Sequence, residues 1–313
     1  MSRYRGGSSF IGNLFNQNSE LVYFFEPLAV YGHGDDKNVD LKVAFLNQTF
    51  HGTVPSYHNA PDATTVYQNE DIINQCKSNG ICMWQLSTRF CQPPFCVNEN
   101  APMDHCGFAC PNLNTTHQLE SVQESMDDAM GIAIKTVRIH DVEKLHPLLS
   151  DTTLDLKILI LIRDPRAIFA SRVTIGEREA KVNGWTMDYD DYLNQISIEC
   201  EQTANGYKWA QQVGLHSQIK YIKFENGVQK PEELRREVYD FIEMNYDEDI
   251  MFKLESRLKP NEYQKSVGGA YLSHINDRGA NDVIDSWQKK LDAAHVEIIL
   301  TVCKDVLSIF NYV

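Results

Sequence analysis

Apolar and polar positions along the chain predict strands that alternate with helices. Residues 156–165, LKILILIRDP, form a nearly continuous apolar run, which is typical of a central parallel strand covered on both faces. Residues 133–139 and 219–227 predict two further strands. The stretch that begins at Pro231, PEELRREVYDFIEM, has the spacing of an amphipathic helix and acidic residues in its first turn. Strands that alternate with helices indicate a doubly wound α/β sheet.

A glycine-rich segment near the N-terminus leads into a helical pattern and then into a strand. Residues 3–21 read RYRGGSSFIGNLFNQNSEL, whose apolar residues recur at helical spacing, and Ser8 or Ser9 is the expected N-cap. The next run, LVYFFEPLAVYG, predicts a buried aromatic strand that stops at Glu26 and Pro27, because proline cannot donate to a sheet ladder.

A glycine-rich loop of this kind normally follows a strand, and only residues 1–4 precede it here. If the sequence begins late, the preceding residues would hold most of that strand and could hold a membrane anchor. As written, the chain is expected to be soluble, because no apolar run reaches the roughly 18 residues of a spanning helix and no signal-peptide core is present. Sequons at Asn47 and Asn114 agree with a secretory-pathway protein.

The composition is that of a folded globular protein. The 313 residues are 42% hydrophobic and 23% charged, which favours one large domain over residues 1–313. Residues 52–115 are rich in Pro, Gly, Asn and Cys and predict an irregular insertion into that domain. The net charge of −14 argues against nucleic acid as a partner. An anionic ligand must therefore meet a local basic pocket, for which two short segments supply Arg3, Arg5, Arg163, Arg166 and Arg172.

The eight cysteines indicate an oxidising compartment. Cys200 and Cys303 lie in helical patterns and are either a long-range disulfide or two buried thiols. The other six crowd into the predicted insertion, where an even cluster is typical of disulfides, although the sequence does not choose among the pairings. Zinc binding is the alternative, against which stand irregular spacings and the lack of a C-x-x-C pair. The six are Cys76, Cys82, Cys91, Cys96, Cys106 and Cys110.

The glycine-rich segment has the features of an anion site. A turn that leads into a helix start directs backbone N–H groups and the positive end of the helix dipole at one point. In residues 4–10, YRGGSSF, the backbone at Gly6 and Gly7 can approach a ligand closely, and Arg5 can neutralise it. The alternative is an ordinary Gly-Gly turn with a serine cap. The Lys-Ser/Thr ending of a Walker loop is missing, which argues against a nucleotide triphosphatase.

A second basic segment follows the most apolar strand. Ligands in open α/β sheets collect at the carboxyl ends of strands, which is where Arg163 falls. If the next residues turn into a helix, Arg163 and Ser171 can reach one phosphate, while Asp164 caps the helix and Pro165 takes its first position. The alternative is a structural Arg-Asp salt bridge at a strand end. Two anion sites on one sheet predict a ligand with phosphates at two ends.

These segments resemble the donor-binding motifs of the Golgi carbohydrate 6-O-sulfotransferase family, which has a P-loop-like fold. RYRGGSSFIGNLFNQNSEL followed by FEPL resembles the family's 5′-phosphosulfate motif, and LILIRDPRAIFASR resembles its 3′-phosphate motif. The likeness continues in KTVRI, YIKFENGVQKPEELRREVYDFI, RGANDVIDSWQKKL and VCKDVLSIFNY. Trp287 in the third of these is expected to pack in the core, with a role as a stacking partner as the alternative. The chain departs from the family at Gly6 (usually serine), at residues 224–226 (usually Tyr-Glu-Asp) and at Asn311, which replaces the glycine before Tyr312.

The resemblance implies an enzyme that transfers a sulfuryl group from PAPS (3′-phosphoadenosine 5′-phosphosulfate) to a carbohydrate hydroxyl. The expected acceptor is the 6-O position of N-acetylglucosamine, galactose or N-acetylgalactosamine in a glycoprotein or proteoglycan, and the expected place is the Golgi lumen, with secretion as the alternative. No metal is expected, because a sulfuryl group carries less charge than a phosphoryl group. The expected donor-binding residues are Tyr4, Arg5, Gly6, Gly7, Ser8, Ser9, Phe10, Arg163, Asp164, Pro165, Arg166, Ser171 and Arg278.

Sulfuryl transfer needs an in-line attack on sulfur and a base for the acceptor hydroxyl. Arg5 is expected to stabilise the charge that grows on the leaving 5′-phosphate, and Glu26 is expected to be the base. A turn cap is the alternative role of Glu26, and His33 is a weaker substitute base. Lys135 and Arg138 could stabilise charge or hold the acceptor, or they could be solvated strand-end residues.

Two rival functions stand beside this one. A glycan-binding protein could keep the fold and lose catalysis, against which stand the intact Arg5, Glu26, Arg163 and Ser171. A nucleotide-dependent kinase is the second rival, which tight metal-independent binding of PAP (3′-phosphoadenosine 5′-phosphate), the product of the donor, would exclude. The sugar and linkage that are modified, the pairing of the clustered cysteines and the oligomeric state cannot be read from the sequence.

Overall fold

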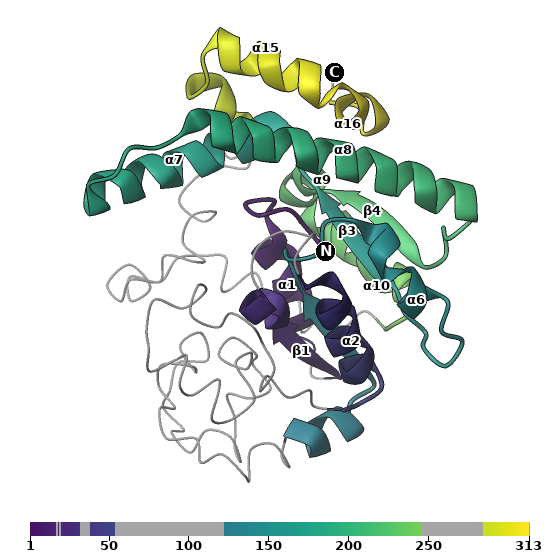
Figure 1. The fold of residues 1–313 in the computed structure, drawn as a ribbon. Coiled ribbons are helices and arrows are strands. Elements are labelled where there is room, and N and C mark those ends of the chain that lie inside the picture. The colour runs from purple at the N-terminus through teal and green to yellow at the C-terminus, as the bar shows by residue number, and fades with distance from the viewer. Residues whose placement is uncertain (17, 19, 32–37, 54–121, 246–283, 313) are drawn as a thin grey trace. The chain divides into compact units, whose positions relative to one another are not determined.

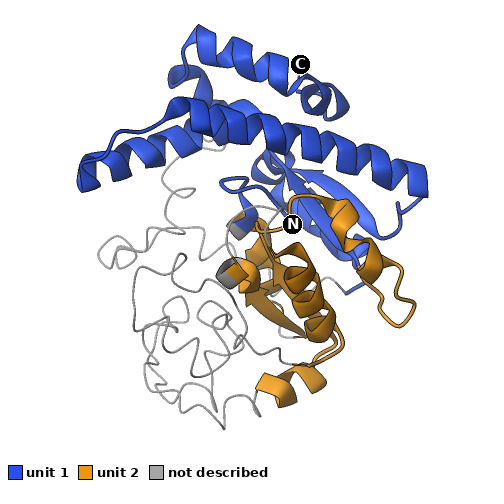
Figure 2. Cartoon of the chain, in the orientation of Figure 1, with its two compact units in different colours: residues 1–9, 157–313 blue, residues 10–156 orange. Residues whose placement is uncertain are grey.

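The computed structural model describes residues 1–16, 18, 20–31, 38–53, 122–245 and 284–312 (Figure 1). The predicted insertion and its six cysteines fall almost wholly outside these residues, as do the Asn114 sequon, His33 and Arg278. The chain forms two compact units, one of residues 1–9 with 157–313 and one of residues 10–156 (Figure 2). The expectation of one domain over residues 1–313 stays a prediction.

The unit of residues 10–156 is built on two parallel strands. β1 (Leu21–Phe25) pairs with β2 (Gly131–Lys135), and Leu21 lies opposite Gly131. The residues of β1 are buried up to Phe24, which gives this unit the aromatic core strand that the sequence predicts. The described helical elements of this unit include α1 (Ser8–Asn16, which starts in the other unit), η1 (Pro27–Tyr31), α2 (Val39–Phe50), η5 (Val142–Leu145) and α6 (His146–Leu149).

Glu26 lies where both strands of this unit end. β1 stops at Phe25, as the Glu26-Pro27 pair predicts. The prediction of a strand over residues 133–139 is wrong at both ends, because β2 starts at Gly131 and stops at Lys135. Beyond that point the Val137 N–H donates to Glu26 Oε2 at 3.2 Å, so a side chain takes the place of a strand neighbour.

The unit of residues 1–9 and 157–313 has a second parallel pair. β3 (Ile158–Ile162) pairs with β4 (Ile219–Lys223), with Ile158 opposite Ile219 and Ile162 opposite Lys223. The predicted α/β class with parallel strands is therefore confirmed. In Figure 1, α15 and α16 lie along the long helix α8. Within the described residues of this unit the helical elements are α7 (Pro165–Asn183), α8 (Tyr189–Val213), α9 (Phe224–Gln229), α10 (Pro231–Phe241), η6 (Asp285–Lys289), α15 (Ala293–Val302) and α16 (Lys304–Ile309).

The ends of β3 and β4 lead directly into helices. Asp164 caps α7 by accepting the Arg166 N–H at 2.9 Å, and Pro165 is the first residue of α7, as predicted. The strand predicted over residues 219–227 ends earlier, because α9 begins at Phe224. The Phe224 side chain is buried, and the strand-to-helix change brings it to the end of the sheet.

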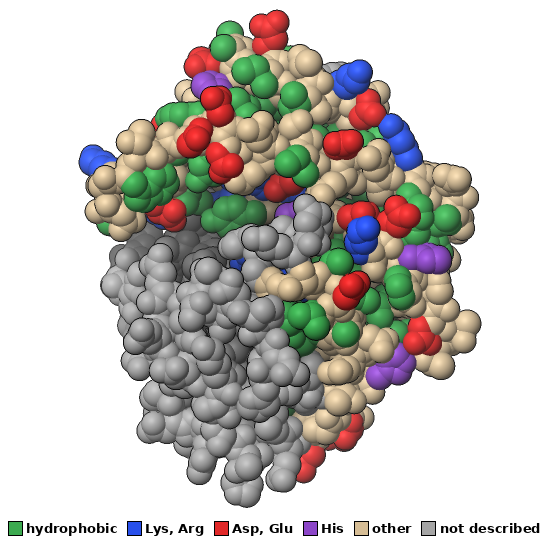
Figure 3. All heavy atoms as spheres, in the orientation of Figure 1, with side chains coloured by type: hydrophobic (Ala, Val, Ile, Leu, Met, Phe, Trp, Pro, Cys, Tyr) green, Lys and Arg blue, Asp and Glu red, His purple; other side chains and the backbone are tan. Residues whose placement is uncertain are grey.

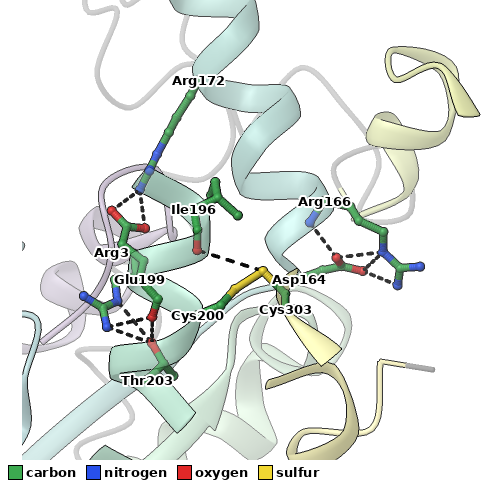
Figure 4. Close-up of a disulfide and its surroundings, with 9 residues drawn as sticks. All are labelled: Arg3, Asp164, Arg166, Arg172, Ile196, Glu199, Cys200, Thr203 and Cys303. Atoms are coloured by element: carbon green, nitrogen blue, oxygen red, sulfur yellow. Dashed lines mark hydrogen bonds and ion pairs between the residues drawn. A yellow bond between two sulfur atoms is a disulfide. The ribbon is translucent and has the colours of Figure 1, made fainter. Parts of the chain in front are cut away.

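Cys200 and Cys303 form a disulfide between α8 and the end of α15. Both residues are buried, and the bond spans 103 residues of sequence (Figure 4). Of the two alternatives that the sequence leaves open for this pair, the structure selects the disulfide.

Removing this disulfide is expected to lower the free energy of unfolding by about 2–5 kcal/mol, because the cross-link restricts the unfolded chain. Urea unfolding of Cys200→Ala, Cys303→Ala and the double variant measures it. Either single variant already breaks the bond, so the double variant should lose no more than the larger single loss. Losses that simply add would contradict the bond.

The surface agrees with the acidic composition. On the face drawn in Figure 3, acidic side chains are spread over the region of α8 and α15. Among the described residues, no helix has the length and hydropathy to cross a membrane.

Candidate active site

The first residues of the chain lie along β3. The Met1 ammonium group donates to the Leu159 carbonyl at 2.6 Å, and the Leu161 N–H donates to the Met1 carbonyl at 3.0 Å. Ser2 forms a parallel bridge with Leu161. These bonds place the following loop, residues 3–9, beside the carboxyl end of β3, where ligands of α/β sheets collect.

The glycine-rich turn is tight and packs against Phe224. Gly6 donates its N–H to the carbonyl three residues earlier at 2.9 Å, and the backbone of Arg5 (φ 67°) and Gly7 (φ 90°) is left-handed. A Cβ on Gly7 would lie closer to the Phe224 ring than real side chains approach. α1 begins at Ser8, so Ser8 lies in the first helical turn and does not precede it as a cap. The first N–H groups of a helix are not used by its own backbone ladder, so a helix start of this kind is suited to face an anion.

Two of the arginines in these segments hold the loop in place (Figure 4). Arg3 donates to the Thr203 hydroxyl at 2.8 Å and to the Glu199 carbonyl at 3.0 Å, both on α8. Arg172 on α7 has a side chain only 1% exposed, donates to the Tyr4 carbonyl at 2.9 Å and pairs with the Glu199 carboxylate at 2.8 Å. The sequence suggested both arginines as parts of a basic pocket, and their contacts instead make them supports of the loop.

Replacing Arg172 with alanine is expected to lower the free energy of unfolding by about 3–5 kcal/mol, because it leaves the Glu199 carboxylate without its buried partner. Urea unfolding followed by circular dichroism measures the loss. Arg178→Ala, at an exposed position on the same helix, is the control and should cost no more than about 0.5 kcal/mol. Equal effects of the two variants would contradict a supporting role for Arg172.

The two predicted anion segments meet within one unit. Arg5 donates through Nε to the Ser171 hydroxyl at 3.2 Å, and Arg163 donates through Nη1 to the Arg5 carbonyl at 2.9 Å. The Arg163 guanidinium lies over the Phe224 ring at 4.7 Å from its centre. Burial lowers the pKa of Arg163, and the charge of nearby Glu225 opposes that shift. Arg5, Arg163 and Ser171 can therefore act on one anionic ligand.

Arg166 has protein partners on several sides. It donates to the Asp164 carboxylate at 2.7 Å and to the Tyr312 carbonyl at 2.9 Å. Trp287, expected in the core, is half-buried, and the Arg166 guanidinium lies over its ring at 4.3 Å. The structural Arg-Asp salt bridge considered for this motif is thus present, and the expected contact of Arg166 with a donor stays a prediction.

The remaining donor-binding candidates are partly described. Tyr4, within the loop, is 46% exposed, and Phe10 lies in the first turn of α1. Pro165 is buried at the start of α7. The side chain of Ser9 and all of Arg278 lie outside the described residues. Their roles stay predictions.

In the other unit, Glu26 lies at the end of β1 within a group of hydrogen-bond donors. Its carboxylate pairs with Lys135, accepts the Val137 N–H at 3.2 Å and lies 3.7 Å from Arg138 Nε. The side chains of Glu26, Lys135 and Arg138 are each 11% exposed, so the two basic residues are not solvated strand-end residues. Glu26 also has a left-handed backbone (φ 51°), which non-glycine residues adopt at a cost.

The donors around Glu26 are themselves held in place. Lys42 on α2 is fully buried and donates to the Arg138 carbonyl at 2.9 Å. Burial lowers the pKa of Lys135, and the neighbouring Glu26 opposes this shift. Burial, and then the Glu26 charge, raises the pKa of Tyr23 on β1. A carboxylate with fixed oxygens is suited to accept a proton or to orient a hydroxyl group.

Sequence reasoning missed three residues that organise the candidate site. Glu199 joins Arg172 to α8, and Glu225 and Tyr312 bond to each other at 2.7 Å near Arg163. The sequence contains one signal for Glu225 and Tyr312. Two of the departures from the family pattern lie at or beside them, namely residues 224–226 and Asn311. Asn311 has φ 53°, a conformation that asparagine tolerates in place of glycine.

Comparisons with known proteins agree with the motifs. The model of the sulfotransferase domain family matches residues 2–311. Carbohydrate sulfotransferase 1 of Danio rerio is 27% identical over 98% of this chain and 76% of its own length, and carbohydrate sulfotransferase 5 of Homo sapiens is 24% identical over 100% and 76%. The solved sulfotransferase domain from the curacin biosynthetic pathway covers 96% of this chain and 94% of its own at 14% identity, with a TM-score of 0.46. Because the family model spans nearly the whole chain, this protein belongs to the sulfotransferase domain family and is a sulfotransferase.

Proposed function

We propose that this protein transfers a sulfuryl group from PAPS to a carbohydrate hydroxyl. The proposed acceptor atom is the 6-oxygen of an N-acetylglucosamine, galactose or N-acetylgalactosamine residue in a glycoprotein or proteoglycan. The names of the relatives, which are carbohydrate sulfotransferases, support a carbohydrate acceptor. The resemblance of the two motifs to those of the 6-O-sulfotransferases supports the position.

The observation that carries the proposal is the meeting of the two anion segments. The bonds from Arg5 to Ser171 and from Arg163 to the Arg5 carbonyl join a glycine-rich loop to a strand-end arginine 158 residues away in sequence. PAPS has anionic groups at both ends of its ribose, which suits two neighbouring basic segments. In this proposal the loop binds the 5′-phosphosulfate, and Arg163 with Ser171 binds the 3′-phosphate.

The proposed reaction is a single in-line displacement at sulfur. The acceptor oxygen forms the new S–O bond as the bond from sulfur to the 5′-phosphate oxygen breaks, and PAP leaves with the electron pair of that bond. Negative charge grows on the leaving phosphate, where Arg5 and the N–H groups at the start of α1 would stabilise it. These groups are fixed before the reaction, so they need little reorganisation, and the mechanism needs no metal.

Glu26 is the proposed acceptor of the hydroxyl proton. Its carboxylate oxygens are held in place by Lys135 and the Val137 N–H. Lys135 and Arg138 would stabilise the carboxylate before it takes the proton. In this role Glu26 acts as the general base and Arg5 as the stabiliser of the leaving group.

The proposed place of action is the Golgi lumen, with secretion as the alternative. The Cys200–Cys303 disulfide supports an oxidising compartment. The Asn47 sequon lies on the described helix α2 with its asparagine exposed.

Incubation with ³⁵S-labelled PAPS and a panel of neutral and sulfated oligosaccharides tests the function. Label should enter a carbohydrate acceptor, and blocking the 6-hydroxyl of that acceptor should remove the signal. Transfer to the blocked sugar would contradict the 6-position, and an absence of transfer across the panel despite PAP binding would favour a binding protein that has lost catalysis.

A further inference from the structure

A closed ring of hydrogen bonds joins Tyr312 to the turn that follows β3. The Tyr312 hydroxyl donates to Glu225 Oε2 at 2.7 Å, and Glu225 Oε1 accepts the backbone N–H of Asp164 at 3.0 Å. Arg166 donates to the Asp164 carboxylate at 2.7 Å and to the Tyr312 carbonyl at 2.9 Å. Asp164 takes part in the ring twice, through its backbone N–H and through its carboxylate, so the ring fixes both its backbone and its side chain.

The ring lies in a buried environment. Asp164 and Glu225 are 7% and 8% exposed, so a lost hydrogen bond there is not readily replaced by water. Burial raises the pKa of Tyr312, and the Glu225 and Asp164 charges raise it further, which keeps its hydroxyl protonated as a donor.

Arg163 is the residue on which this ring acts. It immediately precedes Asp164, and its guanidinium lies over Phe224, which immediately precedes Glu225. The hydrogen bond from the Asp164 N–H to Glu225 therefore joins the backbone next to Arg163 to the backbone next to Phe224, whose phenyl ring lies under the Arg163 guanidinium. A shift of either one would move the guanidinium away from Arg5 and Ser171.

Further contacts fix the position of Tyr312. Lys223 donates to the Phe310 carbonyl at 2.8 Å, and its ammonium group lies over the Tyr312 ring at 4.1 Å. Asn311, between Phe310 and Tyr312, has a left-handed backbone that turns the chain. Both the carbonyl and the hydroxyl of Tyr312 then reach the ring of hydrogen bonds. These contacts place Tyr312 through the backbone as well as through its side chain.

We propose that Tyr312 is a positioning residue for the 3′-phosphate of the donor, acting through Glu225 and Asp164 on Arg163. This inference rests on the proposed function, because it needs a ligand whose 3′-phosphate meets Arg163. Tyr312 itself does not touch the ligand in this account. It makes the chain's C-terminal segment a part of the machinery that distinguishes a 3′-phosphorylated nucleotide from one without that group.

Tyr312→Phe tests the inference through two ligands. The variant keeps the ring and removes the hydroxyl, which leaves the buried Glu225 carboxylate without one donor. Calorimetric titration should show PAP binding about tenfold more weakly than to the wild type, while the affinity for adenosine 5′-phosphate, which lacks the 3′-phosphate, changes less than about twofold.

Tyr207→Phe is the matched control. Tyr207 packs against Phe310, two residues before Tyr312, so this variant also removes one tyrosine hydroxyl but leaves the ring of hydrogen bonds intact, and it should bind both ligands as the wild type does. Unchanged PAP affinity in Tyr312→Phe, or an equal loss for both ligands, would overturn the inference. A wild type that does not bind PAP would instead refute the proposed function. Should Tyr312→Phe not fold, Glu225→Gln undergoes the same comparison and should also weaken PAP selectively.

Discussion

Replacing Gly7 with alanine is expected to reduce sulfuryl transfer at least about 100-fold, since small displacements of positioned groups cost that much. Gly7 has φ 90°, which strains any residue with a side chain, and the added Cβ would collide with the Phe224 ring. The ring supports Arg163, so the collision disturbs both anion segments at once. The free energy of unfolding should fall by about 1–3 kcal/mol. Initial rates of transfer from PAPS and urea unfolding measure the two effects.

Gly214→Ala is the control that separates the backbone strain of a left-handed residue from the collision with Phe224. Gly214 ends α8 with φ 74°, and a Cβ there would meet nothing within 4 Å. The control carries a similar backbone penalty of about 1 kcal/mol, but its transfer rate should equal that of the wild type. If Gly7→Ala retained the activity of the control, the close contact between the loop and Phe224 would have no part in catalysis.

Replacing Glu26 with glutamine is expected to lower kcat by about 10²–10⁴-fold, the usual contribution of a general base. The amide keeps the shape of the carboxylate, but its single acceptor oxygen can keep the bond from either Lys135 or the Val137 N–H, and it cannot take up the acceptor proton. Affinity for PAP should stay within about twofold, because the proposed role concerns the acceptor. Initial rates at saturating PAPS and calorimetric titration of PAP separate the two steps.

Glu20→Gln is the control for the loss of a carboxylate from the same unit. Glu20 is exposed just before β1, and its replacement should change neither kcat nor PAP binding. A Glu26→Gln variant with kcat within about threefold of the wild type would assign the proton to another group, since a loss that small lies below the usual contribution of a general base.

The strand and helix pattern could be predicted because it depends on local spacing. The apolar run of β3, the Asp164 cap and Pro165 at the first helical position all follow from short-range rules, and the structure confirms each. The end of β2 could not be predicted in this way. It depends on Glu26, whose side chain takes up a backbone N–H that lies 111 residues further along the chain.

The roles of the basic residues could be predicted only in part. Arg3 and Arg5 are two positions apart in one segment, yet Arg3 bonds to α8 and Arg5 bonds to Ser171 on α7. Nothing in the segment itself distinguishes them, because their partners lie 200 and 166 residues away. The contact between Glu225 and Tyr312 could not be predicted either, because the two residues are 87 positions apart and a hydrogen bond at that separation leaves no periodic pattern in the sequence.

The family departures have local explanations in the structure. A Cβ on Gly6 would press against Ser2 and the Arg3 carbonyl, so glycine suits this turn where relatives of the motif have serine. Phe224 supplies the surface beneath Arg163 and lies against Gly7, which ties that departure to the loop as well. The two departures thus belong to the same packed turn.

Calorimetric titration of PAP in the presence of a metal chelator tests the central claim most directly. If Arg5, Arg163 and Ser171 form a site for a nucleotide with phosphates at both ends, PAP should bind one to one without magnesium, and ATP should bind far more weakly with or without magnesium. Arg163→Ala should lose PAP binding by at least about tenfold. Binding of ATP that needs magnesium, together with no binding of PAP, would contradict the claim and point to a kinase.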